Sequence, residues 1–315
     1  SIKTKKGVVL CSGGFEYNKA MRKAFLEGPG ETGWAFYGSP DNTGDGIIMA
    51  LAVGAGLQKV GKAAARMIMA VPIYHHGLKM GLDTPIVGSK HSMLVDNYGK
   101  RFCSETKVIE DPSRYMFYKE AVHMNIDDLT YPRLPAWLIF DDELCKKRTL
   151  TDLGHSTAGF GFVPWTKDNQ DAIKRGWVLE ASTPEELAEK IRNIPENKNR
   201  MTAKALKESI EKFNSFCTKG KDEEFGRRAN TLAPISTGKF YAVPLVAGGP
   251  DTKGGIAANG DRACGDWFGK PIPRLYAAGE IASALKFVYQ GGGNLTECIV
   301  FGRIAGKNVA KLKSL

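Results

Sequence analysis

Features that would place a protein in one of several specialised classes are missing from this sequence of 315 residues. It contains no run of eighteen apolar residues, so no segment is predicted to cross a membrane as a helix. It also contains no C-x-x-C pair, and its six cysteines are widely spaced. This spacing favours reduced thiols and argues against a disulfide framework, a zinc site or an iron–sulfur cluster.

The charge balance is basic, but no region concentrates the basic residues. The 44 lysines and arginines outnumber the 34 acidic residues, which gives a net charge of +10, yet the densest cluster is only Lys146-Lys147-Arg148. No basic helix or stacking motif accompanies it, so nucleic-acid binding is disfavoured. With 43% hydrophobic and 25% charged residues, the chain is predicted to be globular, with a sizeable core in two lobes.

The most informative stretch lies near the C-terminus. Leu275 to Ala278 form a strand-like apolar run, Gly279 predicts a turn, and Glu280 offers a carboxylate that can accept hydrogen bonds from polyol hydroxyls. A glycine-rich loop, Tyr289 to Asn294, then leads into a predicted helix. Apolar residues recur along that helix with helical spacing, at Leu295, Ile299, Ile304 and Val309.

The order of these parts resembles the C-terminal flavin-binding segment of the fumarate reductase/succinate dehydrogenase flavoprotein superfamily. The resemblance implies FAD as the cofactor. It also implies that the strand and turn contact the ribityl chain, and that the helix after the GGN motif points its N-terminus at the flavin. The matching cofactor-binding residues are Gly279, Glu280, Gly292, Asn294 and Leu295, with Ala278 before them and Gly293 between them.

The first strand supports the same family and indicates where the chain falls within it. Gly7 to Leu10 followed by Gly13-Gly14 resembles the family's ATGGF-type strand, which comes late in the FAD-binding domain, and it implies that Ser12, Gly13 and Gly14 bind FAD. We therefore expect this chain to be the C-terminal part of a longer flavoprotein whose dinucleotide fingerprint lies upstream. Gly28 to Gly33 imitates that fingerprint but follows a predicted helix and not a strand, so a loop is expected there.

A second glycine-containing turn opens a predicted helix. Thr43 or Asp45 would cap the helical run from Ile47 to Leu57. In the family, the matching TGDG turn lies beside the isoalloxazine ring. The resemblance therefore adds four cofactor-binding residues: Thr43, Gly44, Asp45 and Gly46.

Between about Tyr74 and Gly238 the sequence becomes richer in charge and proline. A capping box at Thr183 predicts a helix that ends at Arg192, Thr202 caps another helix, and Pro135 to Asp141 is predicted as a buried strand. The family uses this section as a mobile capping domain. The resemblance implies an α/β fold, an FAD-binding domain of glutathione-reductase type without its N-terminal part, interrupted by an α+β cap. The expected boundaries are 1–74 and 241–315 for the FAD-binding domain and 75–240 for the cap.

The anion contacts of the family's dicarboxylate reductases are missing. Asp251 stands where a histidine precedes the T-x-G-G motif, Gln290 replaces an arginine, and Thr84-Pro85 replaces a Thr-Glu pair. Each charge-assisted hydrogen bond lost to a carboxylate would cost ~1.5–3 kcal/mol. The acid-catalytic arginine of that branch would fall at Ile109 without a gap in the alignment, or at Arg114 with one, and this ambiguity keeps the dicarboxylate alternative open.

The loop Tyr289 to Gly293 looks more like that of the 3-ketosteroid dehydrogenase branch. That resemblance implies that the Tyr289 hydroxyl and the Gly293 N–H bind the substrate carbonyl and stabilise an enolate. The branch takes its base from the cap, where Tyr115 and Tyr118 are the candidates. His75-His76 is interpreted as an exposed hinge pair, and no third ligand supports a metal site there.

We therefore expect an FAD-dependent oxidoreductase that adds or removes hydrogen across a carbon–carbon bond next to a carbonyl. One alternative is a fumarate reductase-like reductase of a small unsaturated acid, and another is a non-catalytic fragment or assembly subunit. The substrate is expected to be a small carbonyl compound, with an unknown electron donor or acceptor. The localisation stays open, with the cytoplasm favoured, because any export signal would lie upstream.

Overall fold

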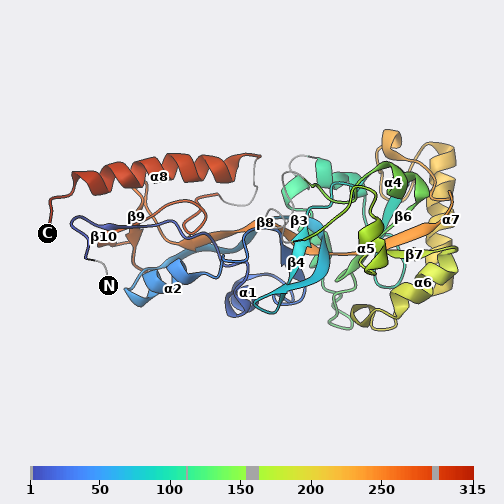
Figure 1. The fold of residues 1–315 in the computed structure, drawn as a ribbon, viewed down its shortest axis with the longest axis horizontal. Coiled ribbons are helices and arrows are strands. Elements are labelled where there is room, and N and C mark those ends of the chain that lie inside the picture. The colour runs from blue at the N-terminus through green and yellow to red at the C-terminus, as the bar shows by residue number, and fades with distance from the viewer. Residues whose placement is uncertain (1–2, 111–112, 154–162, 286–290) are drawn as a thin grey trace. The chain divides into compact units, whose positions relative to one another are not determined.

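The computed structural model in Figure 1 describes residues 3–110, 113–153, 163–285 and 291–315. The fold is mixed α/β, and the chain divides into two compact units. Unit 1 comprises Ser1–Glu31, Gly38–Ala64 and Pro250–Leu315, and unit 2 comprises Thr32–Tyr37 and Ala65–Gly249. Two long strands, β3 (Leu57–His75) and β8 (Phe240–Ile256), each run from one unit into the other.

Unit 1 is built on a small sheet. Strand β1 (Val8–Leu10) pairs in parallel with β10 (Pro271–Ala277), and β10 pairs antiparallel with β9 (Ala263–Gly265). The long C-terminal helix α8 (Gly293–Lys311) packs on this sheet, with Tyr276, Ala278 and Ala305 at the centre of the contact. The predicted strand after residue 6 and the predicted C-terminal helix are therefore confirmed.

The apolar residues of α8 are less buried than their helical spacing predicts. Leu295 and Ile299 are both 72% exposed, and the buried side chains of this helix are Glu297 and Ala305. Thus the spacing correctly predicted a helix, but the first two apolar positions lie on its exposed side. Helix α1 (Lys19–Phe25) is the helix predicted to precede Gly28, and its Asn18 side chain caps it by accepting a hydrogen bond from the Met21 N–H.

Helix α2 (Asp45–Ala52) is shorter than predicted and is capped differently. Gly54 has a left-handed φ of 89° and β3 begins at Leu57, so the chain leaves the helix before the predicted end at Leu57. The N-cap is Gly44, with φ 78° and no side-chain capping bond, and not Thr43 or Asp45. The Thr43 hydroxyl instead donates to the Asp45 carboxylate at 3.0 Å.

Unit 2 contains the larger sheet, which has seven strands within the described residues. Its order is β2-β4-β3-β8-β6-β5, with β7 pairing with β8. Strand β6, which pairs with β8 on one side and β5 on the other, is buried at every position, as its apolar sequence predicted. The strands not yet bounded are β2 (Trp34–Phe36), β4 (Leu78–Leu82), β5 (Ser92–Val95), β6 (Ala136–Asp141) and β7 (Leu179–Ala181).

Helices α6 (Pro184–Arg192) and α7 (Ala203–Lys219) pack against each other in unit 2 (Figure 1). The capping box is confirmed: Thr183 Oγ1 accepts the Glu186 N–H at 3.1 Å, and the Glu186 carboxylate accepts the Ser182 N–H at 2.8 Å. The shorter helices are α3 (Tyr118–Ala121), α4 (Asp142–Lys147), α5 (Gln170–Lys174) and the 3-10 turns at Glu105–Ile109, Ser113–Tyr115, Pro195–Asn197 and Ala229–Thr231.

Candidate functional site

Three of the four segments predicted to bind the cofactor meet in unit 1. The Gly44 N–H donates to the Gly14 carbonyl at 3.0 Å, which joins the turn after β1 to the turn before α2. A Cβ on Gly46 would lie 2.1 Å from the Ser12 hydroxyl, and a Cβ on Gly14 would lie 2.0 Å from Glu280 Oε1. Close packing therefore requires glycine at both positions. Gly46 lets α2 approach Ser12, and Gly14 lets the Glu280 side chain approach the turn after β1.

The Glu280 carboxyl belongs to a cluster that the sequence did not reveal. Thr252 Oγ1 lies 3.1 Å from Glu280 Oε1, and the Thr252 N–H donates to Glu16 Oε1 at 2.7 Å. Burial raises the pKa of Glu280 well above its ordinary value, and the charge of Glu16 raises it further. The buried Glu280 carboxyl therefore favours its protonated form more than an exposed glutamate does.

The fourth segment, at the start of α8, is tied to the same cluster through its asparagine. Asn294 hydrogen-bonds through its amide N–H to Asp251 and through its amide oxygen to the Lys253 ammonium. Lys253 Nζ also lies 3.5 Å from Asp251 Oδ2 and 3.9 Å from Glu297 Oε2. The T-x-G-G motif and the GGN motif are thereby linked side chain to side chain.

Glu297 fixes the loop that precedes the helix. Its carboxylate accepts hydrogen bonds from the Ser283 hydroxyl at 2.7 Å, the Ala284 N–H at 2.6 Å and the Leu285 N–H at 3.1 Å. A carboxylate with three donors and a nearby ammonium is well satisfied even though it is buried. This residue therefore has a structural role in holding residues 283–285 against α8.

The arrangement fits the flavin that the resemblance implies. Two buried acceptor atoms, Glu16 Oε2 and Asp251 Oδ1, have no hydrogen-bond partner among the described residues. The first-turn N–H groups of α8 have no partners within the helix, and Gly291 and Gly292 leave open space where a side chain would stand. Unit 1 thus offers Glu16 Oε2 as an acceptor for a hydroxyl group of the cofactor and the α8 N–H groups as donors for an electron-rich ring edge.

The catalytic candidates are distributed over different parts of the chain. Tyr289 lies outside the described residues, and Gly293 is the first residue of α8. The other candidates belong to unit 2, where the Arg114 guanidinium lies 5.0 Å above the ring of Tyr115. Tyr118 is 1% exposed, with its ring 5.1 Å from that of Trp34, as expected of a core aromatic residue.

A second arginine, which the sequence did not single out, lies beside the unit 2 candidates. Arg66 lies 5.9 Å from the Tyr115 ring centre and pairs with Asp83 at 2.6 Å. The Nε of Arg114 is buried and has no hydrogen-bond partner in the part of the chain that the structure describes. Arg66 and Arg114 are far apart in the sequence, so no local motif predicts that both lie beside Tyr115.

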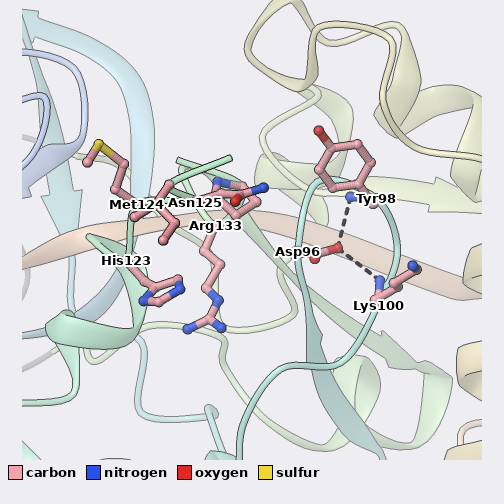
Figure 2. A pocket seen from close by; sticks show the side chains of 9 residues that line it. Asp96, Tyr98, Lys100, His123, Met124, Asn125 and Arg133 are labelled. Carbon is pink, nitrogen blue, oxygen red and sulfur yellow. Dashed lines mark hydrogen bonds between the residues drawn. The ribbon is translucent and has the colours of Figure 1, made fainter. Parts of the chain in front are cut away.

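Unit 2 also contains an open pocket of about 460 Å³, shown in Figure 2. His123 and Arg133 line one side of it and Tyr98 and Lys100 the other, and Asp96 accepts hydrogen bonds from the backbone N–H groups of Tyr98 and Lys100 at 2.9 and 3.0 Å. None of the residues that line this pocket is a predicted site residue. It is therefore a separate feature from the cluster in unit 1.

No group of three or more His, Cys, Asp or Glu side chains among the described residues could hold a metal ion. No helix among them has the length and apolarity required to cross a bilayer. All six cysteines are free thiols.

Comparison with known proteins gives a consistent result. The FAD binding domain family matches residues 1–295. The chain is 30% identical over 340 residues to the 3-oxosteroid 1-dehydrogenase of Mycolicibacterium smegmatis, covering 98% of this chain and 53% of the relative. It is 28% identical to the NADH:fumarate oxidoreductase of Klebsiella pneumoniae, covering 97% and 28%.

A solved structure is similar in fold as well as in sequence. The 3-ketosteroid delta1-dehydrogenase from Sterolibacterium denitrificans, in complex with 1,4-androstadiene-3,17-dione, superposes with a TM-score of 0.72 at 26% identity. The match covers 97% of this chain and 53% of that one, so the chain spans about half the length of this dehydrogenase and of the Mycolicibacterium relative. The family match extends over most of the sequence and includes all the cofactor-binding residues predicted above. The chain therefore belongs to the FAD binding domain family, and FAD is its cofactor.

Proposed function

We propose that the protein is an FAD-dependent oxidoreductase that adds or removes hydrogen across a carbon–carbon bond next to a carbonyl, on a ring-containing substrate. The observation that carries this proposal is the start of α8 at Gly293, four residues after Tyr289 in the sequence, with its Asn294 side chain bound to the carboxyl cluster of unit 1. The likeness to a 3-oxosteroid 1-dehydrogenase and to a 3-ketosteroid dehydrogenase structure supports the same reaction class.

The roles of the residues follow from their chemistry. The Gly293 N–H and the Tyr289 hydroxyl would donate to the substrate carbonyl and stabilise the negative charge that develops on its oxygen. Bound FAD supplies the group that accepts or donates hydride. Glu280 and the turns at Ser12–Gly14 and Thr43–Gly46 would hold the cofactor, while Asn294 and Leu295 would bring the first turn of α8 to its ring.

The domain roles belong to the same proposal. Residues 1–74 and 241–315 form the second and last parts of an FAD-binding domain of glutathione-reductase type, and residues 75–240 form the capping domain. Both long strands, β3 and β8, pass between the two units of the structure, as an inserted domain requires. The electron donor or acceptor is left open, and a cytoplasmic location remains a prediction.

We also infer that an upstream FAD-binding portion covers exposed apolar faces in unit 1. On α2, Ile48, Met49 and Val53 are 49%, 55% and 60% exposed, and on α8 Leu295 and Ile299 are each 72% exposed. Exposed apolar side chains gathered on two helices are typical of a surface that another element covers. This chain spans about half the length of the Mycolicibacterium relative and of the Sterolibacterium dehydrogenase, which supports this inference.

Flavin absorbance tests the cofactor and the upstream portion together. We expect the purified chain to show weak or no flavin bands after FAD is added, and strong bands when the upstream region is restored, because the pyrophosphate site would then be complete. The visible spectrum before and after gel filtration measures this. Absence of flavin bands in both preparations would favour the alternative of a non-catalytic assembly subunit.

Turnover by a Tyr289 variant tests the carbonyl role. With the upstream region present, Tyr289→Phe is expected to lower kcat on cyclic enones about 10²–10³-fold, because one of the two donors to the enolate oxygen is removed. Tyr74→Phe is the matched control, since Tyr74 is 57% exposed and should leave turnover unchanged. Equal turnover by Tyr289→Phe and the native enzyme would contradict the proposal.

A fumarate reductase-like reduction of small unsaturated acids is the second candidate. The observation that favours it is the pair of guanidinium groups, Arg66 and Arg114, beside Tyr115, since arginine is the side chain best suited to carboxylates. Turnover of fumarate and of related acids by the full protein, lost in Arg114→Gln, would support this candidate over the first.

A further inference from the structure

Asp251 presents two carboxyl oxygens in very different surroundings. The residue is 7% exposed, and its Oδ2 is held by the Asn294 amide and lies 3.5 Å from Lys253 Nζ. Its Oδ1 is buried and has no hydrogen-bond partner among the described residues. A buried carboxyl oxygen without a donor is costly for the protein, and the cost indicates a ligand contact or a proton that the oxygen carries.

The position of this carboxyl matters as much as its burial. Asn294, which holds Oδ2, directly follows Gly293, the residue whose N–H is assigned above to the substrate carbonyl. The hydrogen bond from Asn294 therefore holds the Asp251 side chain against the residue that follows Gly293, whose N–H is the proposed enolate-binding group. A base at this place would lie close to the carbon next to the carbonyl.

Burial and the neighbouring charges bring the pKa of Asp251 close to neutral pH. Burial raises the pKa of Asp251 to about 7, the Lys253 ammonium partly offsets this rise, and the nearby carboxyls of Glu16 and Glu297 add to it. Burial also raises the pKa of Glu280, in the same cluster, well above its ordinary value. A group that is partly ionised at pH 7 can both accept and return a proton there.

We propose that Asp251 is a catalytic base that removes the proton from the carbon next to the substrate carbonyl, with Oδ1 as the accepting atom. In this step the carbon–hydrogen bond breaks and its electron pair stays on the substrate as an enolate. The proton forms an O–H bond on Asp251, so no oxidant is consumed. Lys253 and Asn294 are positioning residues. The inference rests on the proposed function and adds the proton-transfer group that the tyrosines of unit 2 were expected to provide.

Hydrogen exchange measures this step apart from turnover. The FAD-loaded full-length protein would be incubated in D₂O with a saturated 3-ketosteroid and with cyclohexanone, and proton NMR would follow loss of the signals next to the carbonyl. Asp251→Asn is expected to slow exchange about 10²–10⁴-fold, because the amide cannot take up the proton. Asp261→Asn, an exposed substitution of the same kind in unit 1, is the matched control and should exchange at the native rate.

A second variant keeps the test decisive if Asp251→Asn does not fold. Lys253→Met removes the ammonium that favours ionised Asp251, so the pKa of Asp251 should rise and the pH midpoint of exchange should move upward. Native exchange rates in Asp251→Asn, or an unmoved midpoint in Lys253→Met, would overturn the role of Asp251 while leaving the proposed function intact. A native enzyme that neither exchanges these hydrogens nor turns over enones would instead refute the proposed function.

Discussion

Replacing Arg101 with methionine is expected to lower the free energy of unfolding of unit 2 by about 3–5 kcal/mol, because it leaves buried carboxylates without their counter-charge. Arg101 Nη2 lies 2.9 Å from Glu105 Oε2 and 3.0 Å from Asp222 Oδ2, and all three side chains are at most 2% exposed. Urea denaturation, followed by far-ultraviolet circular dichroism, measures the change.

The guanidinium is also packed between aromatic rings. Its central carbon lies 5.1 Å from the ring of Phe213 and 5.2 Å from that of Phe225. Because methionine preserves much of the apolar contact, the loss measured is mainly electrostatic. The partly compensating charge of Arg227, 3.4 Å from the Glu105 carboxylate, keeps the expected loss within the range for a single broken buried pair.

Arg192→Met is the matched control. It removes an arginine from the same unit, but its partner Glu189 lies 3.6 Å away and both side chains are about half exposed. Such a pair contributes about 0–1 kcal/mol. Equal losses in the two variants would contradict the view that the Arg101 network stabilises this unit through its buried charges.

The same network predicts a dependence on pH. Burial raises the pKa of Asp222, but the hydrogen bond and charge of Arg101 lower it by more, so the net pKa lies below the ordinary value. A carboxyl with a lowered pKa stabilises the fold above its unfolded pKa, about 3.9, and loses this contribution as the pH falls through its folded value. The difference between native and Arg101→Met stability should therefore shrink below about pH 4.

Local signals in the sequence predicted most elements because those elements are specified locally. The capping box at Thr183 and the buried strand Ala136–Asp141 depend on residues that are neighbours in the chain, and the structure has both. The end of α2 was missed, since an apolar run continues past Gly54 although its left-handed backbone ends the helix. The exposure of Leu295 and Ile299 was missed as well, because helical spacing predicts a stripe but not what covers it.

In the candidate site, the contacts that the sequence did not predict join residues far apart in the chain. Family motifs in the sequence identified Gly14, Glu280 and Asn294, and the structure brings each into contact with the cluster. The carboxyl of Glu16 was missed, since its partner Thr252 lies 236 residues away and no short-range pattern links the two. A buried cluster of carboxyl groups is a property of packing, and only the fold assembles it.

The glycines of the T-x-G-G motif provide a second example and the basis of the last prediction. Gly255 has a φ of 126° and faces the backbone of Ile281. A Cβ there would lie 2.1 Å from the Ile281 carbonyl oxygen, and the adjacent Ile256 N–H donates to that same oxygen at 2.8 Å. This glycine therefore allows β8 to approach the residue that follows Glu280.

Gly255→Ala is accordingly expected to destabilise unit 1 and to weaken FAD binding together. The left-handed backbone and the contact with Ile281 should each cost about 1–3 kcal/mol, because backbone atoms cannot move aside as a flexible side chain can. Gly260→Ala is the control, since a Cβ there meets no atom within 4 Å. Thermal unfolding and FAD titration of the full-length protein measure both effects. If Gly255→Ala weakened FAD binding without loss of stability, the glycine would serve direct contact with the cofactor and not the approach of the two backbone segments.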